Sequence, residues 1–250
     1  MKIHPLSGFL PSITLFGVVI PIYFVVCALA FIFAMLLLVS RADRSGLSRN
    51  RALDVSLVLM IAGFVGSRLF HVFFEEPAYY WARPVLVFDI WSGGFVWYGG
   101  ALLGSVSAIL FLVWKREPIL RWLDLFAPVG ALGYAIGRMA CVLTGCCYGR
   151  VFAWGGELYR HPTQSYAVTW ELAVLALLLW VEGREKMRRS GSLFFLWLAL
   201  HGVGRILMES FRDDPRGLAL LGLSISTWIS LGLLGISASF FTLKNRLRQT

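Results

Sequence analysis

The 250-residue sequence is short of charge. Only 15% of its residues are charged, with 14 Asp and Glu and 23 Lys and Arg, whereas a typical soluble domain has about 25% charged residues. It also lacks any stretch typical of a soluble second domain or a low-complexity linker. These absences exclude a soluble enzyme on a membrane anchor, and they exclude a disordered or fibrous chain.

Cysteine is scarce and poorly spaced for chemistry. Four cysteines in 250 residues do not make a disulfide framework, and no C-x-x-C pair, a stronger metal or redox signal, is present. Cys146 and Cys147 are adjacent and cannot easily chelate one ion together, although Cys141, five residues before Cys146, could approach it. We expect structural cysteines, no metal site and no cofactor. A disulfide on an oxidising side of the membrane stays open.

Hydrophobic residues are abundant: they make up 58% of the chain, and the mean hydropathy is +0.73. Seven apolar runs have the length of about 20 residues that crosses a bilayer, and together they use about 140 residues and leave only short loops. The runs are Ile13–Val39, Ala52–Phe74, Gly94–Trp114, Ile119–Leu143, Thr163–Val181, Ser192–Met208 and Leu218–Leu243. We predict an all-α polytopic integral membrane protein with about seven transmembrane helices, in a single domain over residues 1–250.

Basic residues are distributed unevenly between the two ends of these runs. Alternate loops hold 14 of the 23 Lys and Arg, the opposite loops hold six, and Arg68, Arg138 and Arg205 lie within or at the edges of runs. Because basic residues gather in cytoplasmic loops, we predict an outside N-terminus and a cytoplasmic C-terminus. The net charge of +9 therefore indicates cytoplasmic loops and anionic membrane lipids, and not nucleic acid.

The three arginines in the runs are candidate functional residues, because an ionisable group inside a span is costly. All lie toward the predicted outer ends of their runs, and Glu209 is four residues after Arg205, so these two share a helix face and could pair. Guanidinium groups bind phosphate bidentately and stay charged. We predict a cationic pocket for a phospholipid headgroup, formed by Arg68, Arg138 and Arg205, with Arg212 following at the outer end of the sixth run. The alternative is that each arginine snorkels or bridges two helices.

Two glycine pairs, Gly93–Gly94 and Gly99–Gly100, surround an aromatic patch at a predicted outer boundary. Glycine permits irregular backbone and the close approach of a ligand or another helix. Plain helix packing explains Gly100 and Gly104 well, but it explains Gly93–Gly94 less easily. Farther along, Glu171 lies deep in the fifth run and needs a partner.

Two membrane classes are disfavoured. No internal repeat is evident, and most charges in the runs lie toward one face, whereas a transporter usually shows repeats and charges near the midplane. A retinal-type receptor is disfavoured because the last run has no internal lysine; Lys244 lies at its edge. A transporter or receptor remains a third hypothesis, to be tested by flux in proteoliposomes.

Five segments, in this order, resemble the bacterial prolipoprotein diacylglyceryl transferase family. They are GSRLFHVFFE from Gly66, WSGGFVWYGG from Trp91, GRMACVLTGCCYGR from Gly137, HPTQSY from His161 and RILMESFRDD from Arg205. The resemblance implies transfer of a diacylglyceryl group from phosphatidylglycerol to the lipobox cysteine thiol of a prolipoprotein, with release of glycerol phosphate. It also implies lipoprotein biosynthesis at the bacterial cytoplasmic (inner) membrane, with phosphatidylglycerol and the prolipoprotein signal peptide as partners.

The resemblance also implies which residues form the site. The catalytic residues are Arg138, which contacts the lipid phosphate, Arg205, Glu209 and Tyr98. The substrate-binding residues are Arg68, Gly93, Gly94, Gly99, Gly100, Gly145, Gly149, Arg150, His161, Gln164, Tyr166 and Arg212. Arginines placed where the departing phosphate gathers charge lower the barrier, and cationic surroundings favour the attacking thiolate.

The chain departs from the family's pattern at positions of acid–base chemistry. The family usually has His, Asn and Glu where this sequence has Tyr98, Cys141 and Cys146, and Glu where it has Ala167. Tyrosine can donate a hydrogen bond to a phosphate, but it is a poor base at neutral pH. The alternative function is therefore a non-catalytic or altered-specificity paralogue that binds phospholipid or lipoprotein.

Overall fold

The computed structural model describes residues 3–4, 12–15, 18–90, 93–183, 191–213 and 219–247. The chain forms two compact units, Met1–Leu37 with Leu123–Thr250 (unit 1) and Leu38–Trp122 (unit 2). The prediction of a single domain stays a prediction. Some basic residues counted for the orientation lie outside the described residues: Lys2, Arg184, Lys186, Arg188, Arg189, Arg216 and Arg248.

Seven helices of the described chain are long and apolar enough to cross a membrane. They are α1 (Ile22–Arg44), α2 (Arg49–Phe70), α4 (Trp97–Trp114), α5 (Ile119–Thr144), α6 (Thr163–Glu182), α7 (Ser192–Glu209) and α8 (Ile225–Arg246). The π-helical turn η1 (His71–Glu75) extends α2. The predicted all-α, polytopic fold class is confirmed, while the side of the membrane that each terminus faces stays a prediction.

The first apolar run does not begin as a helix. Strands β2 (Ser12–Leu15) and β3 (Val18–Pro21) form an antiparallel hairpin, and the helix starts at Ile22. The predicted start at Ile13 was therefore wrong. β-Branched residues dominate both strands and favour extended backbone. Pro21 ends the hairpin where its missing N–H costs little.

The last run is also interrupted at its start. Strands β6 (Ala219–Leu220) and β7 (Leu223–Ser224) precede α8, so the helix begins later than the predicted Leu218. The reason is the N-cap: the Ser224 hydroxyl accepts a hydrogen bond from the Thr227 N–H at 3.2 Å. Length and apolarity alone do not mark this boundary.

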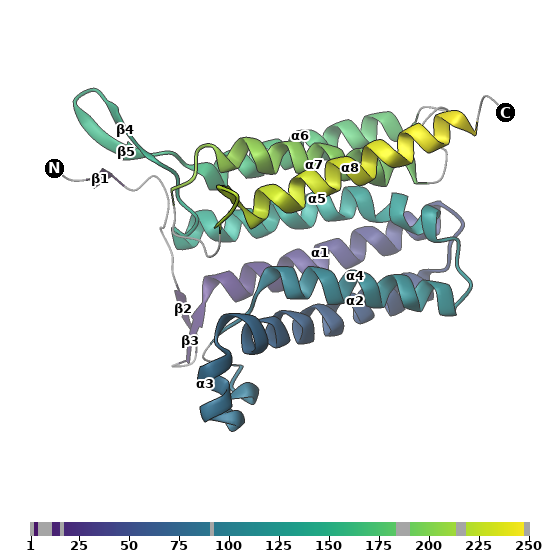
Figure 1. Ribbon diagram of the computed structural model, residues 1–250. Helices are drawn as coiled ribbons and strands as arrows, with labels where there is room; N and C mark the ends of the chain where they lie inside the picture. Colours follow the sequence, from purple (N-terminus) through teal and green to yellow (C-terminus); the bar gives the residue numbers. More distant parts are fainter. Residues whose placement is uncertain are drawn as a thin grey trace. The chain divides into compact units, whose positions relative to one another are not determined.

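In unit 1, helices α5, α6, α7 and α8 lie side by side (Figure 1). A buried apolar cluster joins α5, α6 and α7: Ala127, Ala131, Val174, Leu178 and Leu193. Strands β4 (Val151–Trp154) and β5 (Glu157–Arg160) form a hairpin between α5 and α6, and β1 (Ile3–His4) pairs with β5 in parallel.

One carboxylate fixes the start of α7. Asp124 on α5 accepts hydrogen bonds from the backbone N–H groups of Gly191 at 2.7 Å, Leu193 at 2.9 Å and Phe194 at 3.0 Å. The first N–H groups of a helix have no partner within the helix, and a negative charge there is stabilising. This contact ties the start of α7 to α5.

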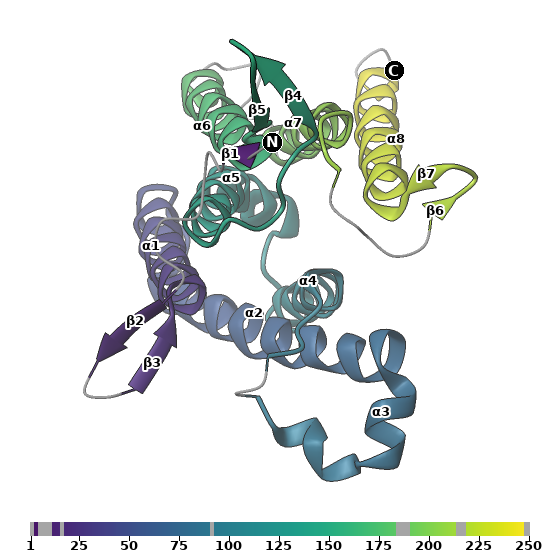
Figure 2. The same ribbon diagram turned by 90° about the vertical axis from the view of Figure 1, so that its left-hand side faces the viewer.

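In unit 2, α2 and α4 pack along their lengths, and α3 (Pro77–Ala82) follows α2 (Figure 2). Glycines make this packing possible: a Cβ on Gly66 would lie 2.5 Å from the Gly99 carbonyl oxygen, and one on Gly100 would lie 2.8 Å from that of Gly63. Gly99 and Gly100 therefore have a packing role, the alternative considered for this pair. The 3₁₀ turn η2 (Pro84–Phe88) leads from α3 toward α4.

Candidate functional site

A narrow cationic cavity lies within unit 1. Three arginines line it: Arg138 from α5, Arg205 from α7, and Arg212 just after α7. The other lining residues are Cys147, Thr163, Gln164, Ala167 and Met208. The structure thus brings together Arg138 and Arg205, two of the three arginines that the sequence assigned to a phosphate pocket, with Arg212, which was assigned to substrate binding.

Tyr134 sits between two of these arginines. The Arg138 guanidinium lies over the Tyr134 ring, 4.8 Å from its centroid, and Arg205 donates to the Tyr134 hydroxyl at 3.4 Å and to that of Ser226 at 2.9 Å. These partners are neutral, so both guanidinium groups keep their charge for an anion. Arg205 directs its hydrogen bonds to these hydroxyls and not to Glu209, with which the sequence suggested a pair.

The turn after α5 forms one wall of the cavity. Gly145 and Cys147 both have left-handed backbone, with φ of 71° and 59°. The start of α6 holds the turn, because the Thr163 hydroxyl donates to the Cys147 carbonyl at 2.7 Å and the Gln164 amide donates to the Cys146 carbonyl. The predicted residues Gly145 and Gln164 thus shape this wall, and Gln164 also lines the cavity.

Gly149 and Arg150 connect this turn to the end of α7 through their backbone. The Arg150 N–H donates to the Phe211 carbonyl at 2.8 Å, and the Gly149 N–H donates to the His161 carbonyl at 3.0 Å. A Cβ on Gly149 would lie 2.7 Å from both of these carbonyl oxygens, so only glycine fits. Gly149 is also bridged to Arg212, which places that arginine beside the cavity.

His161 and Tyr166 belong to an aromatic cluster next to the cavity. The His161 ring stacks on Phe152 at 4.5 Å and meets Phe211 at 5.3 Å. Its Nδ1 lies 3.3 Å from the Tyr166 hydroxyl. Within the described chain, neither His161 nor Tyr166 is among the residues that line the cavity, so they support its frame.

In the structure, Arg68 contacts backbone carbonyls and does not line the cationic cavity for which the sequence suggested it. It is 6% exposed, and its Nε and two terminal nitrogens donate to the backbone carbonyls of Leu86, Val87, Asp89, Gly93 and Gly94. A guanidinium has five N–H groups, so these five carbonyls use its whole donor capacity. The structure therefore makes Arg68 a clamp for η2 and for described residues that follow it toward α4, and leaves no N–H group of this guanidinium for a phosphate.

The other predicted residues of unit 2 surround this clamp. Gly93 and Gly94 have left-handed backbone, with φ of 84° and 77°, and a Cβ on Gly94 would lie 2.7 Å from a terminal nitrogen of Arg68. Tyr98 is half-buried in the first turn of α4, with its ring 5.4 Å from that of Trp97. These residues belong to unit 2, whereas every residue lining the cavity belongs to unit 1.

A buried pair, Glu171 and His201, was not predicted. The His201 Nδ1 hydrogen-bonds a carboxylate oxygen of Glu171, and the Trp197 indole donates to the other at 3.4 Å. Glu171 lines a second, narrow hollow that shares Arg205 with the first. Two features of the sequence point to this pair. Glu171 requires a partner within the bilayer, and His201 lies one helical turn before Arg205 on α7.

We predict that removing either member of this pair is strongly destabilising. Glu171→Leu or His201→Leu should each cost about 3–5 kcal/mol, because each leaves a buried polar group without its partner, while the double variant should lie close to the wild type. Thermal unfolding in detergent micelles measures the three variants as a double-mutant cycle. Costs that simply add in the double variant would contradict this coupling.

Three cysteine side chains converge at the end of α5. The Sγ atoms of Cys141, Cys146 and Cys147 all lie within 4.8 Å of one another, and each cysteine is a free thiol. The expectation that neighbouring cysteines could not face one ion overlooked the left-handed backbone of this turn, which folds the side chains together. Hydrogen bonds from the other two thiols, and the positive charges of Arg212 and Arg138, lower the pKa of the Cys147 thiol.

Comparisons with known proteins agree with this architecture. A family model described as prolipoprotein diacylglyceryl transferase matches residues 11–243. A phosphatidylglycerol–prolipoprotein diacylglyceryl transferase of Clostridium tetani is 32% identical over 94% of this chain and 97% of its own length. Relatives of the same name from Geobacter sulfurreducens (34% identical; 77% of this chain, 78% of the relative) and Verminephrobacter eiseniae (36%; 75% and 72%) also match. The chain therefore belongs to the prolipoprotein diacylglyceryl transferase family.

Proposed function

We propose that this protein transfers a diacylglyceryl group from phosphatidylglycerol to the cysteine thiol of a prolipoprotein and releases glycerol phosphate. The observation that carries the proposal is the convergence of Arg138, Arg205 and Arg212 on one cavity. Phosphatidylglycerol supplies the anionic phosphate that such a cavity suits. The names of the relatives supply the same donor and acceptor.

The chemistry follows from where charge develops. The acceptor thiolate forms a bond to the terminal glycerol carbon of the diacylglyceryl group, and the bond from that carbon to the phosphate oxygen breaks. The electron pair leaves with the phosphate. Arg138 and Arg205 are already held by Tyr134 and Ser226, so stabilising the departing charge requires little reorganisation. The same positive charges favour the thiolate form of the acceptor.

Other predicted residues keep proposed roles. Glu209 lies one helical turn beyond Arg205 on α7, and Tyr98 keeps the catalytic role that the resemblance implies. Gln164 and the turn at Gly145 shape the cavity wall. For Arg68, the contacts favour a positioning role over direct phosphate binding.

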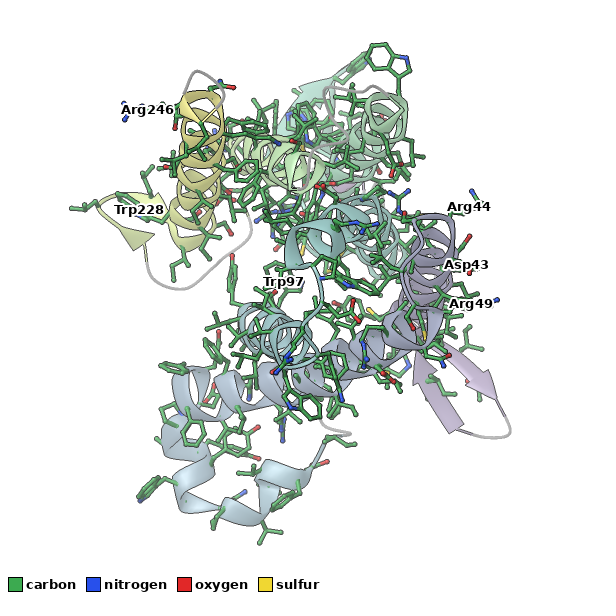
Figure 3. The ribbon with its side chains drawn as sticks, turned by 90° about the vertical axis from the view of Figure 1, so that its right-hand side faces the viewer. Asp43, Arg44, Arg49, Trp97, Trp228 and Arg246 are labelled. Carbon is green, nitrogen blue, oxygen red and sulfur yellow. The ribbon has the colours of Figure 1, made fainter. Side chains whose placement is uncertain are left out.

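We further propose a location in the bacterial cytoplasmic (inner) membrane, with the N-terminus outside and the C-terminus in the cytoplasm. The described basic residues at one set of helix ends support this orientation: Arg41, Arg44, Arg49, Arg51, Lys115, Arg116, Arg121, Lys244 and Arg246. Arg44 and Arg49 point away from the helices at neighbouring ends of α1 and α2 (Figure 3). The proposed protein partner is the prolipoprotein signal peptide with its lipobox cysteine, and nucleic acid is not a partner.

A reconstituted assay tests the function. Purified protein in vesicles containing phosphatidylglycerol is incubated with a lipobox peptide, and mass spectrometry detects the diacylglyceryl peptide. A peptide with serine in place of the lipobox cysteine should give no product. The Clostridium tetani relative serves as the positive control. If that relative forms product and this protein does not, the proposed transfer is wrong.

The replacement of the family's usual His, Asn and Glu by Tyr98, Cys141 and Cys146 favours one alternative, a paralogue that binds phospholipid or lipoprotein without transfer. The same vesicles distinguish it from the transferase. Retained binding of the lipobox peptide, lost in Arg138→Ala and without product formation, would support the binding protein.

A further inference from the structure

The cysteine cluster has the donor set of a metal site. Cys141 lies in the last turn of α5, and Cys146 and Cys147 follow in the turn. Their Sγ atoms lie within 4.8 Å of one another. Thiolate sulfur is the ligand that Zn²⁺ and other thiophilic ions prefer. The fourth cysteine of the chain, Cys27 on α1, is outside this group.

The distances suit coordination after a small adjustment. Zn–S bonds are about 2.3 Å, so sulfurs around one tetrahedral zinc lie about 3.8 Å apart. A shift of about 1 Å or less at each sulfur would bring the three thiols to that spacing. Rotation of the cysteine side chains can supply it, since neither the backbone of the turn nor α5 has to move.

The surroundings hold the ligands in place. Thr163 and Gln164 bind the carbonyls of Cys147 and Cys146, so the turn is fixed from α6. The Thr144 hydroxyl lies 3.5 Å from the Cys146 sulfur and donates to it. Residues that support a ligand in this way strengthen metal binding.

The charge balance is also favourable. Three thiolates and one divalent ion carry a net charge of −1, and Arg138 and Arg212 line the same cavity as Cys147. The arginines therefore stabilise the loaded cluster instead of repelling it. The fourth coordination position of such an ion would stay open, as it does where three protein ligands hold zinc. Cys147 lines the cavity, so that position would be reached from the cavity side.

We propose that Cys141, Cys146 and Cys147 form a trithiolate site for one thiophilic divalent ion, with Zn²⁺ as the probe that defines it. The proposal rests on the positions of the three sulfur atoms and does not depend on the transfer reaction. It gives a role to two of the residues that depart from the family's usual pattern, Cys141 and Cys146.

Metal titration of the full chain tests this site. The protein is purified in detergent under reducing conditions, freed of metal and titrated with Zn²⁺, and bound zinc is measured by inductively coupled plasma mass spectrometry. We expect one ion per chain. Co²⁺ in place of Zn²⁺ should produce a thiolate-to-cobalt charge-transfer absorption band. Cys146→Ser should weaken zinc binding by at least about 100-fold, which exceeds the loss typical when a residue that hydrogen-bonds a metal ligand is replaced. The control variant Cys27→Ser should bind zinc as the wild type does.

A second measurement needs no variant. Zn²⁺ should protect three of the four thiols of the wild-type protein from alkylation, counted by intact mass. No stoichiometric zinc, or equal alkylation of all four thiols with and without zinc, would overturn the site, as would a disulfide among the three that persists in place of metal uptake. Product formation in the vesicle assay without zinc uptake overturns this site alone. Zinc uptake without product leaves the site standing and counts only against the proposed transfer.

Discussion

Replacing Arg138 with alanine should lower the rate of diacylglyceryl transfer by about 10²–10³-fold, the loss typical when one preorganised charge-stabilising donor is removed. Arg138 lines the cavity from α5 and is held against the Tyr134 ring. Its guanidinium is placed where the departing phosphate gathers negative charge. The measurement is the initial rate of diacylglyceryl peptide formation in phosphatidylglycerol vesicles.

Two further variants make this result specific. Arg138→Lys keeps the charge but loses the planar fork that binds phosphate bidentately, so its rate should fall between those of the wild type and Arg138→Ala. Arg246→Ala removes an exposed arginine from the last turn of α8 (Figure 3) and should leave the rate unchanged. A wild-type rate in Arg138→Ala would contradict the proposal that the cavity stabilises the departing phosphate.

A large stability effect is expected at Arg68. Arg68→Ala leaves the carbonyls of Leu86, Val87, Asp89, Gly93 and Gly94 without their shared donor. Hydrogen bonds to a charged group contribute about 1.5–3 kcal/mol each, so the loss should reach about 3–5 kcal/mol even after water replaces some of them. Lysine has three donors on a single nitrogen and cannot span five carbonyls, so Arg68→Lys should not rescue the protein.

Hydrogen exchange measured by mass spectrometry distinguishes this clamp from a phosphate site. In Arg68→Ala, exchange should accelerate most in residues 84–90 and 93–94, whether or not phosphatidylglycerol is present. Arg83→Ala, which removes an exposed arginine next to the same segment, should exchange like the wild type. Unchanged exchange in Arg68→Ala together with weaker lipid binding would instead restore the phosphate role.

The seven helices could be predicted because run length and apolarity are properties of one segment at a time. The starts of α1 and α8 could not. They depend on a hairpin that uses part of an apolar run, and on the cap made by Ser224. Both features depend on local hydrogen bonds, which a hydropathy profile averaged over about 20 residues does not detect.

The sequence could identify several residues of the site, but it could not show where their side chains point. The cost of charge in a bilayer marked Arg68, Arg138 and Arg205 equally, but it does not say where a guanidinium points. Arg138 and Arg205 face a cavity, while Arg68 turns into a loop whose left-handed glycines present carbonyls to it. That difference arises from tertiary contacts.

The bonds from Asp124 to the start of α7 have a mechanical consequence. They fasten the start of α7 to α5, and the hydrogen bond from Arg205 on α7 to the Tyr134 hydroxyl on α5 connects the same two helices farther along. Two helices joined by polar contacts at two points are expected to move together. A lipid that entered between α5 and α7 would have to break these polar contacts. We therefore expect lipid to enter unit 1 elsewhere, at the turn after α5 or along α6 and α8.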